Sequence, residues 1–190
     1  MSTFLPKNDL QLKEAFGHII SREGFSDYIK KISELIHDNN LDKQNLDKVL
    51  NDHNIKQVED IKEDILDMLL AYITFILEDN VITENEAANF KQLKRFFRIR
   101  EGYFYNFRYS NIENILNRQF ELIYADNQID TEEALHKVGL QELFDLSYDQ
   151  FLELVNKEVR AALKRGASPD ELDTVFIKMY QAKRDSQQEE

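Results

Sequence analysis

A short acidic phrase occurs twice in this chain, at residues 79–86 (DNVITENE) and 126–133 (DNQIDTEE), 47 positions apart (126 − 79 = 47). Apolar residues around the phrase recur at the same separation, in the pairs Ile73/Phe120, Ile76/Ile123, Ala87/Ala134, Leu93/Leu140, Phe97/Phe144, Ile99/Leu146 and Phe104/Phe151. A weaker echo, DNNLDKQN, lies at residues 38–45. Repetition at this period is typical of stacked supersecondary units and constrains the fold more strongly than composition does.

Almost every segment has the apolar spacing of an amphipathic helix, and none alternates as a strand does. The segment 57–78 is apolar on more than one face and is expected to be a central, covered helix. Helices are predicted at residues 8–21, 26–37, 42–52, 57–78, 84–98, 103–109, 111–125, 131–145, 148–165 and 169–184. Helix starts marked by capping boxes are predicted at Thr83/Glu86, Ser110/Glu113, Asp130/Glu133 and Ser147/Gln150.

These patterns predict an all-α fold, a single-domain helical bundle of about 8–10 helices with an internal helix–turn–helix repeat. A softer division is expected near residue 55, with 1–55 as an N-terminal helical extension and 56–184 as the main bundle. Residues 185–190 are expected to be a frayed tail.

Composition restricts the function classes. The chain has 24 Lys and Arg against 36 Asp and Glu, a net charge of −12. Nucleic-acid affinity depends on cations that neutralise phosphates, so no nucleic-acid partner is expected. The absence of Cys excludes disulfides and thiolate chemistry and suits a reducing compartment. No signal peptide begins the sequence, and the longest apolar run is about half of a membrane span. These features predict a soluble cytoplasmic protein.

The repeated phrase is predicted to form a corner between two helices. In the first copy, the incoming helix ends at Asp79, Asn80 takes the left-handed conformation that closes it, and Ile82 reaches the core. Thr83 caps the outgoing helix and Glu86 completes the box. The second copy has Asp126, Asn127, Ile129, Asp130 and Glu133 in the same places. A corner of this kind needs no ligand.

The phrase also overlaps the end of the calcium-loop pattern D-x-[DN]-x-[DN]-G-x5-E. The first two ligand positions hold Leu122 and Tyr124 in one copy and Phe75 and Leu77 in the other, so a working calcium loop is not expected. Carboxylates from two corners that meet in the fold could instead share a hard divalent cation. The candidate ligands are Asp79, Glu86, Asp126, Asp130 and Glu133.

The helix, a D-[GN]-x-I-x-x-x-E turn, a second helix and an L-x-L-S restart resemble the TerB-like domain of tellurite-resistance proteins. The motif is carried by residues 125–133 and by Phe144-Asp145-Leu146-Ser147, and the resemblance covers residues 57–165. It implies a cytoplasmic stress-response protein that binds a divalent cation (calcium, zinc or manganese) and acts in complexes with proteins near a membrane surface. The family's acidic residues match Asp79, Glu86, Asp126 and Glu133, whereas Asn80 and Asn127 stand where Gly is usual.

Two Glu-x-x-His pairs, Glu34/His37 and Glu133/His136, have the spacing found in di-iron carboxylate bundles. His37 ends its predicted helix and Glu133 begins its own, whereas di-metal ligands project from the middle of long helices. A di-metal carboxylate oxidoreductase is therefore an alternative rather than the main hypothesis.

Residues 91–109 reverse the charge of the chain, with six cations against one Glu and seven aromatic residues. Such a mixture could bind an anion, a phospholipid headgroup or an acidic partner. The candidate contact residues are Lys94, Arg95, Arg98, Arg100, Tyr103, Tyr105 and Arg108. The ordinary alternative is that the aromatic residues face the core while the cations offset neighbouring acidic helices.

No Gly-rich phosphate loop, G-x-S-x-G elbow or H-E-x-x-H motif occurs in the sequence. We therefore expect a non-enzymatic module of the TerB-like type, and the associated hypothesis is that the acidic corners bind a divalent cation. A metal-free helical scaffold for protein interaction is the first alternative, and the di-metal enzyme is the second.

Overall fold

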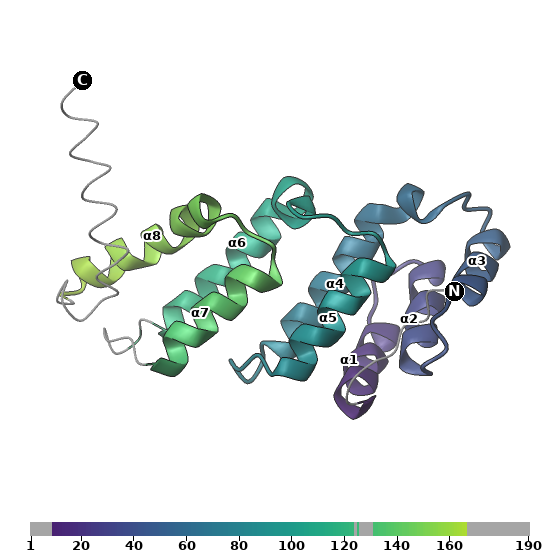
Figure 1. Cartoon of the computed structure of the whole chain (residues 1–190), viewed down its shortest axis with the longest axis horizontal. Helices are drawn as coiled ribbons and strands as arrows, with labels where there is room; N and C mark the ends of the chain where they lie inside the picture. Colours follow the sequence, from purple (N-terminus) through teal and green to yellow (C-terminus); the bar gives the residue numbers. More distant parts are fainter. Residues whose placement is uncertain (1–8, 124, 126–130, 167–190) are drawn as a thin grey trace, which may run out of the picture. The chain divides into compact units, whose positions relative to one another are not determined.

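The computed structural model describes residues 9–123, 125 and 131–166, apart from the side chains of residues 9, 131–135 and 155 (Figure 1). Every regular element within these residues is helical, which confirms the all-α prediction. The elements are α1 (Asp9–Ser21), α2 (Asp27–His37), α3 (Lys43–Asp52), the 3-10 helix η1 (Val58–Ile61), α4 (Lys62–Ile76), α5 (Glu84–Phe96), α6 (Tyr103–Ile123), α7 (Thr131–Leu143) and α8 (Tyr148–Lys164). The helix predicted at 169–184 and the tail at 185–190 lie outside the described residues.

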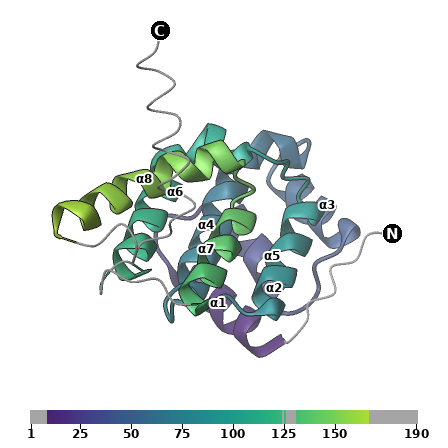
Figure 2. The same cartoon turned by 60° about the vertical axis from the view of Figure 1, so that its left-hand side comes forward.

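The chain forms two compact units, Met1–Tyr109 and Ser110–Glu190. In the first unit α4 is the central helix: α1, α2 and α5 all pack against it, and α1 and α2 also pack on each other. Both views show α1, α2 and α4 side by side (Figures 1 and 2). The buried residues of α4 include neighbours such as Ile65 and Leu66 that point in different directions, as expected for a helix covered on several sides.

A column of aromatic rings runs through the core of the first unit. Phe16 of α1 stacks on Tyr72 of α4, with ring centroids 5.4 Å apart. Tyr72 lies 6.3 Å from Phe90 of α5, which lies 5.9 Å from Phe104 of α6. The boundary predicted near residue 55 thus falls inside one unit, because helices on both sides of it contribute rings to the same core.

The 47-residue repeat of the sequence is also a repeat of the backbone. α7 begins and ends 47 residues after α5 (131 − 84 and 143 − 96). Within α6, Arg108 has the non-helical angles φ −139° and ψ 32°, and the segment 109–123 after this kink lies 47 residues after α4. The capping box predicted at Ser110/Glu113 is wrong, since Ser110 lies inside α6 and the interruption is a kink at Arg108.

The apolar pairs identified in the sequence occupy equivalent places in the core. Both members are buried in Ile73/Phe120, Ile76/Ile123, Leu93/Leu140, Phe97/Phe144, Ile99/Leu146 and Phe104/Phe151. Ala87 is exposed, and the side chain of Ala134 lies outside the described residues. The repeat therefore preserves a pattern of burial, which is what a duplicated folding unit requires.

The weaker echo shares two features with the first acidic phrase: a left-handed Asn, and a helix cap three residues after it. Asn39, between α2 and α3, has φ 55°, and Asn80, between α4 and α5, has φ 60°. Asp42 caps α3 by accepting a hydrogen bond from the backbone N–H of Asn45 at 2.8 Å, and Thr83 caps α5 in the equivalent position. The two corners differ where the incoming helix ends. α2 ends at His37, two residues before Asn39, whereas α4 ends at Ile76, four residues before Asn80, so the predicted helix end at Asp79 is wrong.

We expect Phe16→Ala to destabilise the protein by about 3–5 kcal/mol, because the ring is fully buried and the neighbouring helices cannot close the cavity. Chemical denaturation gives the loss, and amide hydrogen exchange gives its location. Protection should fall in α4 and α5 as well as in α1. Unchanged exchange in α4 would mean that residues 1–55 fold as an independent extension after all.

Candidate functional site

The first acidic corner is satisfied from within the protein. Glu86 lies in the first turn of α5 with 2% of its surface exposed. Its Oε2 accepts hydrogen bonds from the backbone N–H of Thr83 at 2.7 Å and from Thr83 Oγ1 at 2.8 Å. Its Oε1 accepts a hydrogen bond from the side-chain amide of Gln11 in α1. The predicted capping box is confirmed, and Glu86 also ties α5 to α1.

A buried tyrosine lies close to this carboxylate. Burial raises the pKa of Tyr72, the negative charge of Glu86 raises it further, and a hydrogen bond with Asn89 lowers it in part. The phenol is therefore neutral at physiological pH, and its ring packs in the core between Phe16 and Phe90. The exposed Asp79 accepts a hydrogen bond at Oδ1 from the backbone N–H of Val81 at 3.0 Å, which closes the turn before α5.

The five predicted metal ligands are divided between the two compact units. Asp79 and Glu86 belong to the first, while Asp126 and Asp130 lie in the second and outside the described residues. Glu133 lies in the first turn of α7, but its side chain is likewise outside the described residues. Among the residues that are described, no group of three or more His, Asp or Glu side chains could hold a metal ion.

The two Glu-x-x-His pairs make other contacts. Glu34 Oε2 and Lys31 Nζ form an exposed salt bridge at 2.7 Å, and His37 Nδ1 lies 2.8 Å from Asp38 Oδ1. In the second unit, His136 Nε2 lies 2.8 Å from Gln119 Oε1, within hydrogen-bond distance.

The Gln119–His136 pair has a counterpart in the first unit. Its residues stand 47 positions after Tyr72 and Asn89, the hydrogen-bonded pair between α4 and α5 (119 − 72 and 136 − 89). Sequence reasoning missed this repeated polar contact, although the shared separation was the signal that could have revealed it.

Two of the predicted anion-binding cations are turned into the protein. Lys94 is 8% exposed, and its Nζ lies 5.1 Å from the centre of the Phe90 ring. Arg108 reaches Asp67 at 2.6 and 3.0 Å and Glu63 at 2.8 Å. The hydrogen bond to Asp67, followed by that to Glu63, raises the pKa of Arg108 despite partial desolvation. Both cations have structural roles in the first unit.

The remaining cations of the segment are exposed at the end of α5 and just after it. Arg95 and Arg100 are both exposed, and Arg98 makes a 3.1 Å ion pair with Glu59. The aromatic candidates Tyr103 and Tyr105 contact other side chains of the first unit. Tyr103 and Phe107 flank Lys62, whose Nζ lies 4.5 and 4.6 Å from their ring centres, and Tyr105 packs edge-on against Tyr109.

Comparisons with models of protein families, with curated proteins and with solved structures find no match to this chain. The TerB-like resemblance and the activity it implies therefore stay predictions. Within the described part of the chain, no helix combines the length and apolar character that crossing a membrane requires.

We expect Glu86→Ala to cost about 1–2 kcal/mol, because it removes the acceptor for the Thr83 amide at the start of α5. Glu86→Gln should cost less, since Gln150 completes the same kind of box with Ser147 in α8. Urea denaturation of both variants measures the two values. Equal stability of Glu86→Ala and the wild type would show that the corner does not depend on this carboxylate.

Proposed function

We propose that this protein is a non-enzymatic interaction module built from helical repeats, whose corner carboxylates serve folding and whose exposed helix faces bind a protein partner. The observation that carries the proposal is the internal satisfaction of Glu86, which uses its oxygens on Thr83 and Gln11. These hydrogen bonds occupy both lone pairs of Oε2 and one of the two on Oε1, so a divalent cation that binds both oxygens would have to displace a bond from Thr83.

The repeat pattern supports the same function. Equivalent core positions are apolar in both copies, while exposed positions such as Lys91 and Val138, 47 residues apart, differ in chemistry. Helix pairs with periods of about 40–47 residues are the units of arrays that present binding surfaces to other proteins. A binding role of this kind requires that the buried residues of the repeats stay similar while the exposed residues differ.

The cation-binding TerB-like module is the competing proposal, and it places the ion at Asp79, Glu86, Asp126, Asp130 and Glu133. The di-metal oxidoreductase receives less support, because the side chains of Glu34 and His37 are 41% and 40% exposed, whereas di-metal ligands project into the core of a bundle. The chain's lack of Cys supports a cytoplasmic setting for either module.

Thermal melting with calcium, zinc and manganese separates these proposals. A cation held only by the folded protein adds about 2.7 kcal/mol of stability at 100 times its dissociation constant. For an interaction module we expect no such gain at constant ionic strength, and the same response from the wild type and from Asp126→Asn with Glu133→Gln. A saturable gain that the double variant loses would favour the cation-binding module.

Native purification from the source cell provides the positive measurement. The interaction module should elute as a stoichiometric complex with another protein, and its mass by light scattering should fall to that of the free chain at high salt. A free chain under all conditions, together with metal-dependent stability, would contradict the proposal.

A further inference from the structure

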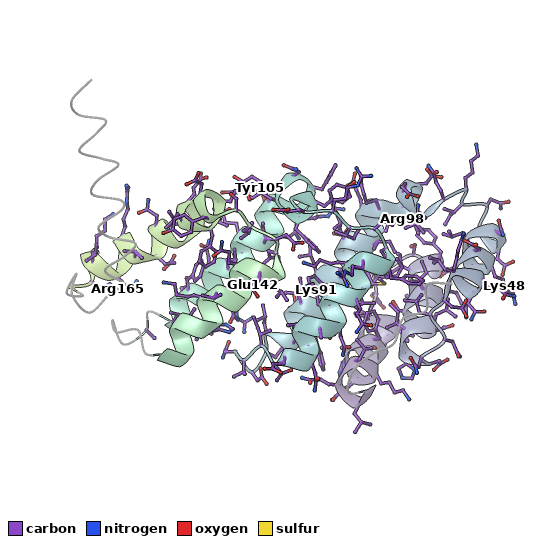
Figure 3. All side chains as sticks on the ribbon, viewed as in Figure 1. Lys48, Lys91, Arg98, Tyr105, Glu142 and Arg165 are labelled. Carbon is purple, nitrogen blue, oxygen red and sulfur yellow. The ribbon has the colours of Figure 1, made fainter. Side chains whose placement is uncertain are left out.

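We infer that the exposed cations at the end of α5 bind an extended acidic segment of a protein partner, an inference that rests on the proposed function and specifies its binding surface. The residues are Lys91, Arg95, Arg98 and Arg100, referred to below as the basic strip. Lys91 and Arg98 are labelled in Figure 3, and all four residues belong to the first unit.

The basic strip is concentrated and mostly uncompensated. All four side chains are exposed, and the sequence holds no Asp or Glu from residue 87 to residue 100. Of these four residues, only Arg98 has an ion pair with a described residue, and both that side chain and its partner Glu59 are exposed, at 75% and 46%. Exposed pairs of this kind contribute little to stability, so the carboxylate of a partner can replace Glu59.

Folding does not explain the basic strip, because the other copy of the unit does without it. The residues 47 positions later are Val138, Glu142, Asp145 and Ser147. α7 has the same length as α5 and no basic residue in its last turn. Interaction of cations with the helix dipole is therefore not a requirement of this helix pair, and the charge on α5 must be accounted for in another way.

The backbone of Arg98 gives a second, independent indication. It has φ 55°, whereas the other non-glycine residues with positive φ in the described part are Asn39, Asn54, Asn80 and Asp145. Asn and Asp enter this left-handed region more readily than other non-glycine residues. An Arg here is a local cost that a stability requirement would have removed, and such costs tend to be retained where a residue has a function.

The spacing of the basic strip specifies the geometry of the ligand. Lys91 and Arg95 are separated by about 6 Å along the helix axis, from a rise of about 1.5 Å per residue. Alternate residues of an extended peptide are about 6.6 Å apart and point to the same side. The matching ligand is a segment with Asp or Glu at every second position.

The charge of the whole chain favours a short peptide over a larger polyanion. At −12, the protein repels an extended anionic surface such as a membrane or a nucleic acid. At physiological salt the attraction of the basic strip extends only about 8 Å, which is enough for one peptide segment in direct contact. We therefore assign a protein ligand to this surface.

Fluorescence anisotropy with a labelled peptide of alternating Glu and Ser, and a control peptide with Gln in place of Glu, tests the assignment. The wild type should bind only the Glu peptide, with an affinity that falls as salt is raised. Arg95→Glu with Arg98→Asp should weaken binding at least about tenfold, since it removes two cations and adds two like charges. These replacements are the residues that α7 and its corner already carry at Glu142 and Asp145, so the fold should tolerate them.

Lys43→Glu with Lys48→Glu on α3 is the matched control, because both double variants take the net charge from −12 to −16 (two cations lost and two anions gained). It should retain the affinity of the wild type. Equal loss in both variants would mean that overall charge, and not the basic strip, holds the peptide. Tighter binding to phosphatidylserine vesicles or to single-stranded DNA than to the Glu peptide would also overturn the inference.

Arg98→Gly separates binding from stability. Gly takes positive φ without strain, so the unfolding midpoint should stay equal or rise while affinity for the Glu peptide falls. A lower midpoint with unchanged affinity would assign Arg98 a structural role instead. Failure of the wild type to bind the Glu peptide overturns this inference alone, because the metal titration and native purification test the interaction module separately.

Discussion

The fold depends on how each helix satisfies its end groups inside a tight corner. A helix leaves four N–H and four C=O groups without partners at its two ends. After α2 and α5 a residue with positive φ follows the helix, and the next amide bonds back into the last turn, as Asn40 N–H does to Leu35 at 2.8 Å and Ile99 N–H to Lys94 at 2.8 Å. Because these bonds fix the direction in which the chain leaves the helix, they also fix where the next helix begins.

The chemistry of such a corner explains its resemblance to a metal site. Capping needs short side chains with oxygen acceptors, and left-handed closure favours Asn and Asp, so a well-formed corner is rich in hard oxygen ligands. The same residue types in the same short span would suit a divalent cation. The two differ in whether the oxygens already accept hydrogen bonds from the protein, and Glu86 accepts them from Thr83 and Gln11.

Local features of the fold were predictable from the sequence. The periodic apolar residues gave most helix bounds to within a few residues, and the positive φ of Asn80 and the box of Thr83 with Glu86 followed from the acidic phrase. The contact of Gln11 with Glu86 was not predictable, because residues 75 positions apart carry no mark of their pairing in local spacing. The continuity of α6 past Ser110 was missed for a related reason: a capping signal does not form a cap when the preceding residues are also helical.

The cations of the charge-reversed segment illustrate where sequence reasoning ends. Lys94 reads as a surface residue, yet its aliphatic stem allows it to lie inward with its ammonium group over Phe90. Arg108 reads as part of a binding surface, yet it joins the kink of α6 to Asp67 and Glu63 of α4. The sequence does not distinguish these two cations from Arg95, Arg98 and Arg100, which are exposed in the structure.

The duplicated unit provides its own comparison between folding and function. The two copies have the same helix lengths, so they form the same backbone structure. A feature that both copies carry, such as the buried pairs Ile73/Phe120 and Leu93/Leu140, is therefore one that this backbone structure requires. A feature that one copy carries and the other lacks is free of that requirement. The cations at the end of α5 are such a feature, and Arg98 carries the further cost of a backbone conformation better suited to the Asp145 of the other copy. The other copy forms its helix and corner without these charges, and the binding role proposed for the basic strip accounts for this difference.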